Sequence, residues 1–266
     1  MTSLPAPGTP VSLPRSRWWD EGALRVFLAW PEQPAPPAGY PLLCLLDGHT
    51  LFGTAVEAAR LQAGRPGATG VQPGVVLGLG HPGNRAAHTA GRRRDYTPPP
   101  FDPVQGTGGA GHLLALLEAR ILPKVSALLP IDPARLALFG HSLGGLVPLH
   151  ALLSRSPLFA RFVAASPSLW WADHALLHRA ETATFATPSR LLLTVGGAER
   201  PDPACTDPER LARQRRTRMV ESVHALAALL SPIMPVTCIE FPGENHGSVL
   251  PAAISRGVGF AFGGEG

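Results

Sequence analysis

The sequence has little lysine and little cysteine. Only one of its 23 basic residues is a lysine, Lys124, and there are three cysteines in 266 residues. Apolar residues make up 45% of the chain and charged residues 16%, so the chain can bury a large core and is not a disordered protein. Uninterrupted apolar runs of about 18 residues, heptad patterns and internal repeats are all missing, which excludes membrane spans, coiled coils and solenoids.

The few cysteines have limited roles. Cys44, Cys205 and Cys238 cannot all pair, and no two have the spacing of metal ligands. Cys44 and Cys238 lie in apolar runs, so we expect buried, inert thiols there. The arginines are scattered along the chain and the net charge is only +4, which argues against nucleic-acid binding. We expect neither a metal ion nor a cofactor.

The N-terminal 16 residues are rich in proline, serine and threonine and show no periodicity. We therefore predict a flexible lead-in over residues 1–16 and one folded domain over residues 17–266. A basic segment followed by an apolar one is missing at the N-terminus, so a cytoplasmic location is the default expectation.

Short apolar segments alternate with helical patterns along the domain. Strands are predicted at 24–30, 41–46, 74–79, 135–139, 161–165, 190–195 and 235–241, and helices at 51–62, 112–129, 143–153, 209–230 and 249–262. Residues 80–109 show neither pattern and are predicted to form a long loop, a feature that is often functional in compact domains. The alternation predicts an α/β protein with a mostly parallel, doubly wound sheet.

The sharpest motif is Gly140-His141-Ser142-Leu143-Gly144, a G-x-S-x-G pattern between a predicted strand and a predicted helix. This setting predicts a sharp turn that exposes the Ser142 hydroxyl above the carboxyl edge of the sheet. We expect side chains at positions 140 and 144 to collide with neighbouring elements. The Leu143 backbone N–H would face the oxyanion of a tetrahedral intermediate. Ser142 is therefore the predicted nucleophile.

A serine hydroxyl needs a base that removes its proton. In hydrolases of this architecture the chain order is serine, carboxylate, histidine, with the histidine after the last strand. His246 follows the last predicted strand in a glycine-flanked turn, so it is the predicted base. Glu199 is the first carboxylate after the preceding strand and is the first choice for the orienting acid. Asp202, Asp207 and a Ser–His pair without a carboxylate are the alternatives.

The loop after the strand predicted at 41–46 reads Asp47-Gly48-His49. A loop at this place supplies the second oxyanion donor in such hydrolases. The backbone N–H of Gly48 or His49 is therefore predicted to be that donor, although a tight Asp-Gly turn explains Asp47 equally well.

Together these segments resemble the esterase-D-related α/β-hydrolases, the family that includes the enterobactin and salmochelin esterases. The resemblance rests on the serine motif and on residues 40–48, 94–98, 165–171 and 244–251, which occur in the family's order. It implies an α/β-hydrolase fold, Ser142 as nucleophile and His246 as base. It also implies a serine esterase that cleaves catecholate siderophore esters through an acyl-enzyme.

The family's substrates are esters of catecholoyl-serine that bind ferric iron as a trianion, so the resemblance implies a positively charged binding site. A guanidinium group suits such a ligand because it pairs with oxyanions and stacks on aromatic rings. The substrate-binding candidates are Arg92, Arg93, Arg94, Tyr96, Trp170 and Trp171. More arginines follow the strand predicted at 190–195, namely Arg200, Arg210, Arg213, Arg215, Arg216 and Arg218. Solvent-exposed arginines without a role, and tryptophans that pack the core, are the alternatives.

Other functions use the same motifs. A general carboxylesterase or an acyltransferase would need the same nucleophile and base, and a binding protein without catalysis is a third hypothesis. The expected partner is a small-molecule ester, with no nucleic acid and no membrane, and the chain is expected to be a monomer or a dimer.

Overall fold

The computed structural model describes residues 12–100, 102–185, 189–202 and 204–264. Within these ranges, eight strands form one sheet in the order β1-β2-β4-β3-β5-β6-β7-β8. They are β1 (Ser16–Glu21), β2 (Leu24–Ala29), β3 (Tyr40–Leu45), β4 (Val75–Gly80), β5 (Ile131–His141), β6 (Arg161–Ala165), β7 (Arg190–Gly196) and β8 (Val236–Phe241). The strand β2 is antiparallel to both of its neighbours, β1 and β4. The other six strands, β3 to β8, are parallel to one another.

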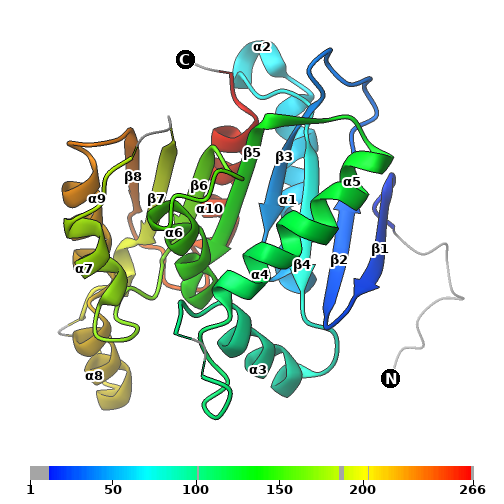
Figure 1. Cartoon of the computed structure of the whole chain (residues 1–266). Helices are drawn as coiled ribbons and strands as arrows, with labels where there is room; N and C mark the ends of the chain where they lie inside the picture. Colours follow the sequence, from blue (N-terminus) through cyan, green and yellow to red (C-terminus); the bar gives the residue numbers. More distant parts are fainter. Residues whose placement is uncertain (1–11, 101, 186–188, 203, 265–266) are drawn as a thin grey trace, which may run out of the picture.

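Helices cover both faces of this sheet (Figure 1). One face carries α1 (Gly48–Ala63) and α10 (Leu250–Phe262). The other carries α4 (Ala110–Leu116), a π-helical turn (Leu117–Ile121), α5 (Leu122–Leu128), α6 (Leu146–Leu153), α7 (Ala175–Glu181) and α9 (Met219–Leu230). The remaining helices lie beyond the strand ends: α3 (Arg85–Asp95) and α8 (Pro208–Thr217) past the carboxyl ends, and the short α2 (Pro66–Thr69) at the opposite end.

The central strands are buried on both faces. Every residue of β3, β4 and β6 is buried, because helices pack against the sheet from both sides. This is why these segments appear in the sequence as short, continuous apolar runs. The predicted α/β class, with a mostly parallel sheet between helices, is confirmed.

The N-terminal part differs from its prediction. β1 was not predicted, and residues before it already contact the domain: Leu13 packs against the core under α1, and the Arg15 carbonyl accepts a hydrogen bond from the Trp30 amide at 3.1 Å. The predicted lead-in over 1–16 is therefore ordered against the fold in its last residues, whereas residues 1–11 lie outside the described part.

The predicted long loop at 80–109 is wrong over its middle, where α3 forms. Asn84 caps this helix, since its side-chain oxygen accepts a hydrogen bond from the Ala87 amide at 3.0 Å. The cap and the good helix formers after it were readable from the sequence. The absence of an apolar stripe hid the helix, because only Gly91 of α3 is buried.

Two further predictions are corrected. The single helix predicted at 209–230 is two helices, α8 and α9, because Arg218 between them adopts a left-handed conformation with φ 43°. Cys238 lies on β8, at the edge of the sheet, and is exposed rather than buried, whereas Cys44 is buried as expected. In the described part of the chain, none of the helices combines the length and the apolar character that a membrane crossing requires.

Candidate active site

The turn between β5 and α6 holds Ser142 in a strained conformation. Ser142 has φ 58°, in the left-handed region that non-glycine residues rarely adopt. A Cβ at Gly140 would lie 2.0 Å from the Gly144 carbonyl oxygen, and one at Gly145 would lie 2.9 Å from Pro167 Cα. A Cβ at Gly144 would find its nearest atom, on the Tyr96 ring, at 3.4 Å. The expected steric need for glycine therefore holds at position 140 but applies to 145 rather than 144.

Ser142, His246 and Glu199 come together at the carboxyl edge of the sheet. Ser142 Oγ lies 2.9 Å from His246 Nε2, and His246 Nδ1 lies 2.6 Å from Glu199 Oε2. The three residues follow β5, β8 and β7, which are neighbours or near neighbours in the sheet. This arrangement has the connectivity of a nucleophile, a base and an orienting carboxylate.

Glu199 is enclosed, whereas His246 faces solvent. The side chain of Glu199 is 4% exposed and that of His246 46%. Glu199 Oε1 accepts hydrogen bonds from Ser166 Oγ at 2.5 Å and from the Gly196 amide at 2.9 Å. Burial by itself raises the pKa of the Glu199 carboxyl, but the hydrogen bonds from His246, Ser166 and Gly196 outweigh it and leave the pKa below its ordinary value.

The other two carboxylates considered for this role bond elsewhere. Asp202 Oδ1 accepts from the Ala204 amide at 2.9 Å, and Asp207 caps α8 by accepting from the amides of Glu209 and Arg210. Both are exposed. Among the three candidate acids, only Glu199 has a hydrogen bond to His246 in the described part of the chain.

The loops after β7 and β8 contact each other closely around this carboxylate. The Ala198 amide donates to the Glu244 carbonyl at 3.0 Å. A Cβ at Gly196 would lie 2.4 Å from that same carbonyl oxygen, so glycine is required for the approach. The backbone contact brings residues 199 and 246, which are 47 positions apart, within hydrogen-bonding distance.

His141, the first variable residue of the motif, holds the histidine loop. Its Nε2–H donates to the His246 carbonyl at 3.0 Å, and the two rings lie 4.6 Å apart. Burial lowers the pKa of His141 to about 3, with His246 contributing, so the ring is neutral at physiological pH. No role was predicted for His141, Ser166 or Ser168, although His141 lies in the serine motif and the two serines lie in the segment 165–171.

The loop that holds Gly48 and His49 lies against the serine turn, since a Cβ at Gly144 would lie 3.5 Å from Asp47 Oδ2. Gly48 begins α1, where the first amides have no partner within the helix. A Cβ at Gly48 would lie 2.8 Å from the Phe27 ring, so glycine lets this end of α1 pack against the sheet. The His49 ring points toward Phe27 and His88, into a neighbouring cavity, so only its backbone is a candidate donor. The Leu143 amide is the first backbone amide after Ser142, within the short turn Ser142–Gly145.

A cavity of about 520 Å³ opens at Ser142. Its wall is formed by residues after β5, β6, β7 and β8, by α8 and by the first residue of α9, namely Ser142, Ser168, Trp170, Ala198, Glu199, Arg210, Arg213, Gln214, Thr217, Met219, Asn245 and His246. Ser168 Oγ lies 3.5 Å from Ser142 Oγ, and its amide donates to the Ser142 carbonyl at 3.0 Å. Ser142 and His246 therefore both border this cavity.

Several predicted substrate-binding residues lie outside this wall. Arg92 Nε donates to Asp47 Oδ1 at 2.8 Å, and Arg94 forms a two-pronged pair with Asp95 at 2.7 Å. Arg93 is exposed on α3. None of the three arginines lines the cavity at Ser142, and Arg92 instead borders a separate cavity of about 230 Å³ together with Asp47 and His141.

The three aromatic candidates also differ in whether they line the cavity. Tyr96 is 1% exposed, and its hydroxyl accepts a hydrogen bond from the Asp47 amide at 3.1 Å. It therefore supports the loop after β3 and does not reach the cavity. Trp170 lines the cavity, whereas Trp171 packs against the core. Of the six predicted substrate-binding residues, Trp170 alone belongs to the described wall.

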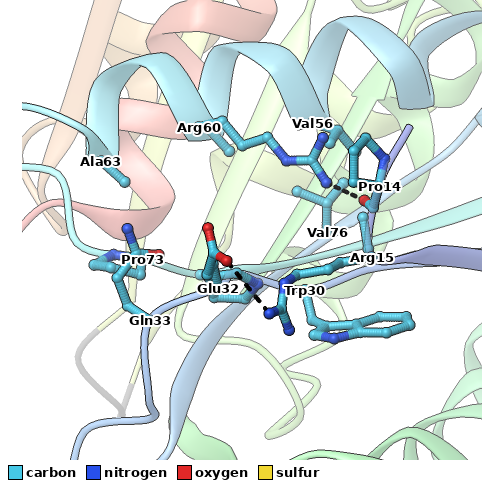
Figure 2. Close-up of a pocket in the computed structure, with 14 residues that line it drawn as sticks. Pro14, Arg15, Trp30, Glu32, Gln33, Val56, Arg60, Ala63, Pro73 and Val76 are labelled. Carbon is cyan, nitrogen blue, oxygen red and sulfur yellow. Dashed lines mark hydrogen bonds and ion pairs between the residues drawn. The ribbon is translucent and has the colours of Figure 1, made fainter. Parts of the chain in front are cut away.

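A second cavity, of about 380 Å³, lies at the opposite end of the sheet (Figure 2). It is bordered by the end of β2, the start of β4 and α1, and Arg15 and Glu32 form an ion pair of 3.5 Å across it. Among the described residues, its lining includes no serine, threonine, cysteine or histidine, so it offers no nucleophile. Nor does the described part of the chain bring together three His, Cys, Asp or Glu side chains that could hold a metal ion.

Comparisons with known proteins identify the family of this chain. Residues 21–230 match the Esterase family, described as "Putative esterase". The chain is 34% identical to a siderophore triacetylfusarinine C esterase of Aspergillus fumigatus, over 96% of this chain and 95% of that protein. It is 33% identical to the ferri-bacillibactin esterase BesA of Bacillus subtilis, over 96% of this chain and 90% of that protein.

The fold is shared with solved structures. The siderophore hydrolase EstB of Aspergillus nidulans superimposes with a TM-score of 0.82 at 29% identity, over 96% of this chain and 98% of that one. The match extends over nearly the whole of both chains, so it concerns the overall fold. The chain belongs to the Esterase family and is a serine hydrolase with the α/β-hydrolase fold.

Proposed function

We propose that this esterase cleaves the ester bonds of siderophores, with Ser142 as nucleophile, His246 as general base and Glu199 as the orienting carboxylate. The observation that carries the proposal is the pair of short contacts, 2.9 Å from Ser142 to His246 and 2.6 Å from His246 to Glu199, at the edge of a cavity of about 520 Å³. Relatives named as siderophore esterases support the substrate class.

The reaction follows from these contacts. Ser142 Oγ attacks the ester carbonyl carbon while His246 Nε2 takes the hydroxyl proton, and the resulting oxyanion lies between the Leu143 amide and an amide at the start of α1, Gly48 or His49. The carbon–oxygen bond to the leaving alcohol then breaks, and His246 returns the proton to that alcohol. Water repeats the sequence on the acyl-enzyme, releasing the acid and restoring Ser142.

Glu199 serves this cycle without exchanging a proton. Its hydrogen bond fixes the His246 tautomer that carries its proton on Nδ1, which leaves Nε2 free to accept from serine. The lowered pKa of the Glu199 carboxyl keeps it ionised, so it stabilises the imidazolium that forms during attack.

At the finer level, we propose catecholate esters of the enterobactin type as substrates. The Trp170 side chain in the cavity wall supports this choice, because an indole ring offers a flat apolar surface to an aromatic acyl group. The distinguishing measurement is kcat/KM for ferric enterobactin against that for p-nitrophenyl butyrate. A strong preference for the simple ester would point to a general carboxylesterase instead.

Ser142→Ala should lower kcat by about 10⁴-fold or more with both substrates. Labelling with a fluorophosphonate probe, followed by peptide mapping, tests the nucleophile directly. Ser168 is the internal control: its hydroxyl lies in the same cavity, 3.5 Å away, but Ser142 is the one that contacts His246. Modification of Ser168 in place of Ser142, or full activity of Ser142→Ala, would refute the proposed roles.

A further inference from the structure

One wall of the cavity at Ser142 is a helix rich in arginine. The residues of α8 that line the cavity are Arg210, Arg213, Gln214 and Thr217. Their spacing of i, i+3, i+4 and i+7 places them on one face of the helix. Asp207 caps the helix through the amides of Glu209 and Arg210, so its start has a defined position. α8 therefore presents two guanidinium groups to the substrate space.

These two arginines have no carboxylate partner among the described residues. Within the described ranges, neither Arg210 nor Arg213 forms an ion pair, and Glu209, although four residues before Arg213, does not reach it. By contrast, Arg200, near the same edge of the sheet, is paired with Glu240. The charges of Arg210 and Arg213 are thus available to a ligand.

The remainder of the wall does not neutralise them. Glu199 is the only carboxylate among the described lining residues, and it is buried and already accepts hydrogen bonds from His246, Ser166 and Gly196. The cavity therefore carries an uncompensated positive charge on the side formed by α8. A guanidinium group at such a place binds anionic oxygens through a planar fork and stacks on aromatic rings.

We propose that Arg210 and Arg213 are specificity-determining residues that select esters whose acyl part is anionic and aromatic. The inference rests on the proposed function, because it concerns the ligand of the same site. A catecholate group meets both requirements of the wall, since its oxygens suit the two guanidinium groups and its ring suits Trp170. The ester carbonyl of such a ligand can reach Ser142 while its charged part lies against α8, because all four side chains line one cavity.

The test compares two double variants of one helix. Arg210→Gln/Arg213→Gln removes the charges that line the cavity, and Arg215→Gln/Arg216→Gln removes two charges from the same helix outside the described wall. The substrates are p-nitrophenyl benzoate and p-nitrophenyl 4-sulfobenzoate, which differ by one anionic group. The measured quantity is the ratio of kcat/KM for the charged ester to that for the neutral one.

We expect the ratio to fall about 10- to 100-fold in Arg210→Gln/Arg213→Gln and less than about twofold in Arg215→Gln/Arg216→Gln. Arg210→Lys/Arg213→Lys keeps the charges and should retain most of the ratio. Rising ionic strength should lower the ratio in the parent and leave the Arg210→Gln/Arg213→Gln variant almost unchanged. Equal losses in both double variants, or no loss in either, would overturn the inference.

Ferric enterobactin separates this inference from the proposed function. If the parent and the Arg210→Gln/Arg213→Gln variant hydrolyse it equally well, the siderophore function stands and the arginine inference fails. If the parent does not hydrolyse it but shows the sulfobenzoate preference and loses it in the variant, the inference stands and the proposed substrate is wrong.

Discussion

Two arginine-bearing helices, α3 and α8, lie beyond the carboxyl ends of the strands and differ in what their arginines contact (Figure 1). On α3, Arg92 is paired with Asp47 and Arg94 with Asp95. On α8, Arg210 and Arg213 line the cavity at Ser142 and have no carboxylate partner among the described residues. Both helices are rich in arginine, but two arginines of α3 pair with carboxylates whereas two of α8 line the cavity.

The difference shows that the partner of a charged residue decides its role. The Asp47–Arg92 pair connects α3 to the loop after β3. The Tyr96 hydroxyl also holds that loop by accepting a hydrogen bond from the Asp47 amide. Asp95 also contacts His81, with 2.7 Å between the His81 Nε2 and the carboxylate oxygen. These contacts hold structure near the site, whereas the charges of α8 remain free for a ligand.

The largest expected effect concerns the centre that both helices flank. Glu199→Gln should lower kcat by about 10²- to 10⁴-fold, because the amide can no longer hold the productive His246 tautomer or stabilise the imidazolium. The measurement is steady-state hydrolysis of p-nitrophenyl butyrate. Asp202→Asn is the matched control and should change kcat by less than about twofold; a large loss in that control would return the acid role to Asp202.

The next largest effect tests whether the arginines of α3 contribute more to the stability of the fold than those of α8. Arg92→Ala leaves Asp47 without its ion-pair partner and should lower the free energy of unfolding by about 1–3 kcal/mol. Arg210→Ala, an exposed position without an ion pair in the described part of the chain, should change it by less than about 0.5 kcal/mol. Urea denaturation followed by circular dichroism checks both. Equal stability of the two variants would contradict the structural role of α3.

The ion pair at the end of α3 also predicts that the stability of the fold depends on pH. Burial by itself raises the pKa of the Asp95 carboxyl, but hydrogen bonds with Arg94 and His81 outweigh it, so the folded-state pKa lies below the ordinary value of 3.8. A lowered carboxyl pKa stabilises the fold above the ordinary pKa, and this contribution is lost as the pH falls through the folded pKa. The urea midpoint of the parent should therefore fall more steeply below pH 4 than that of Asp95→Asn. Parallel curves would show that the ion pair contributes nothing to stability.

The smallest effect is expected at Arg93, which is exposed on α3. Arg93→Ala should change the free energy of unfolding by less than about 0.5 kcal/mol and leave the preference for charged esters unchanged. Urea denaturation and the benzoate pair of substrates provide the measurements. A loss of preference in this variant would restore α3 as a part of the substrate site.

The fold was predictable because its signals are local. The buried strands are short apolar runs, and the serine motif stands between a strand and a helix, so the sequence indicated both the sheet and the position of the serine turn. α3 was missed because only one of its residues is buried, and helical periodicity is visible only where one face packs. The break between α8 and α9 was missed because the residue in the left-handed conformation is Arg218, and the usual sequence signal for that conformation is a glycine.

The sequence by itself determined the class of fold, the serine at the turn after β5 and the histidine after the last strand, because each is signalled by residues adjacent in the chain. Only the tertiary structure brought Glu199, rather than Asp202 or Asp207, into contact with His246, paired Arg92 with Asp47 and placed Arg210 and Arg213 in the cavity wall. Hydrogen bonds and ion pairs form within about 3–4 Å in space, and such distances between residues 45 or more positions apart are set by how strands and helices pack rather than by spacing in the chain.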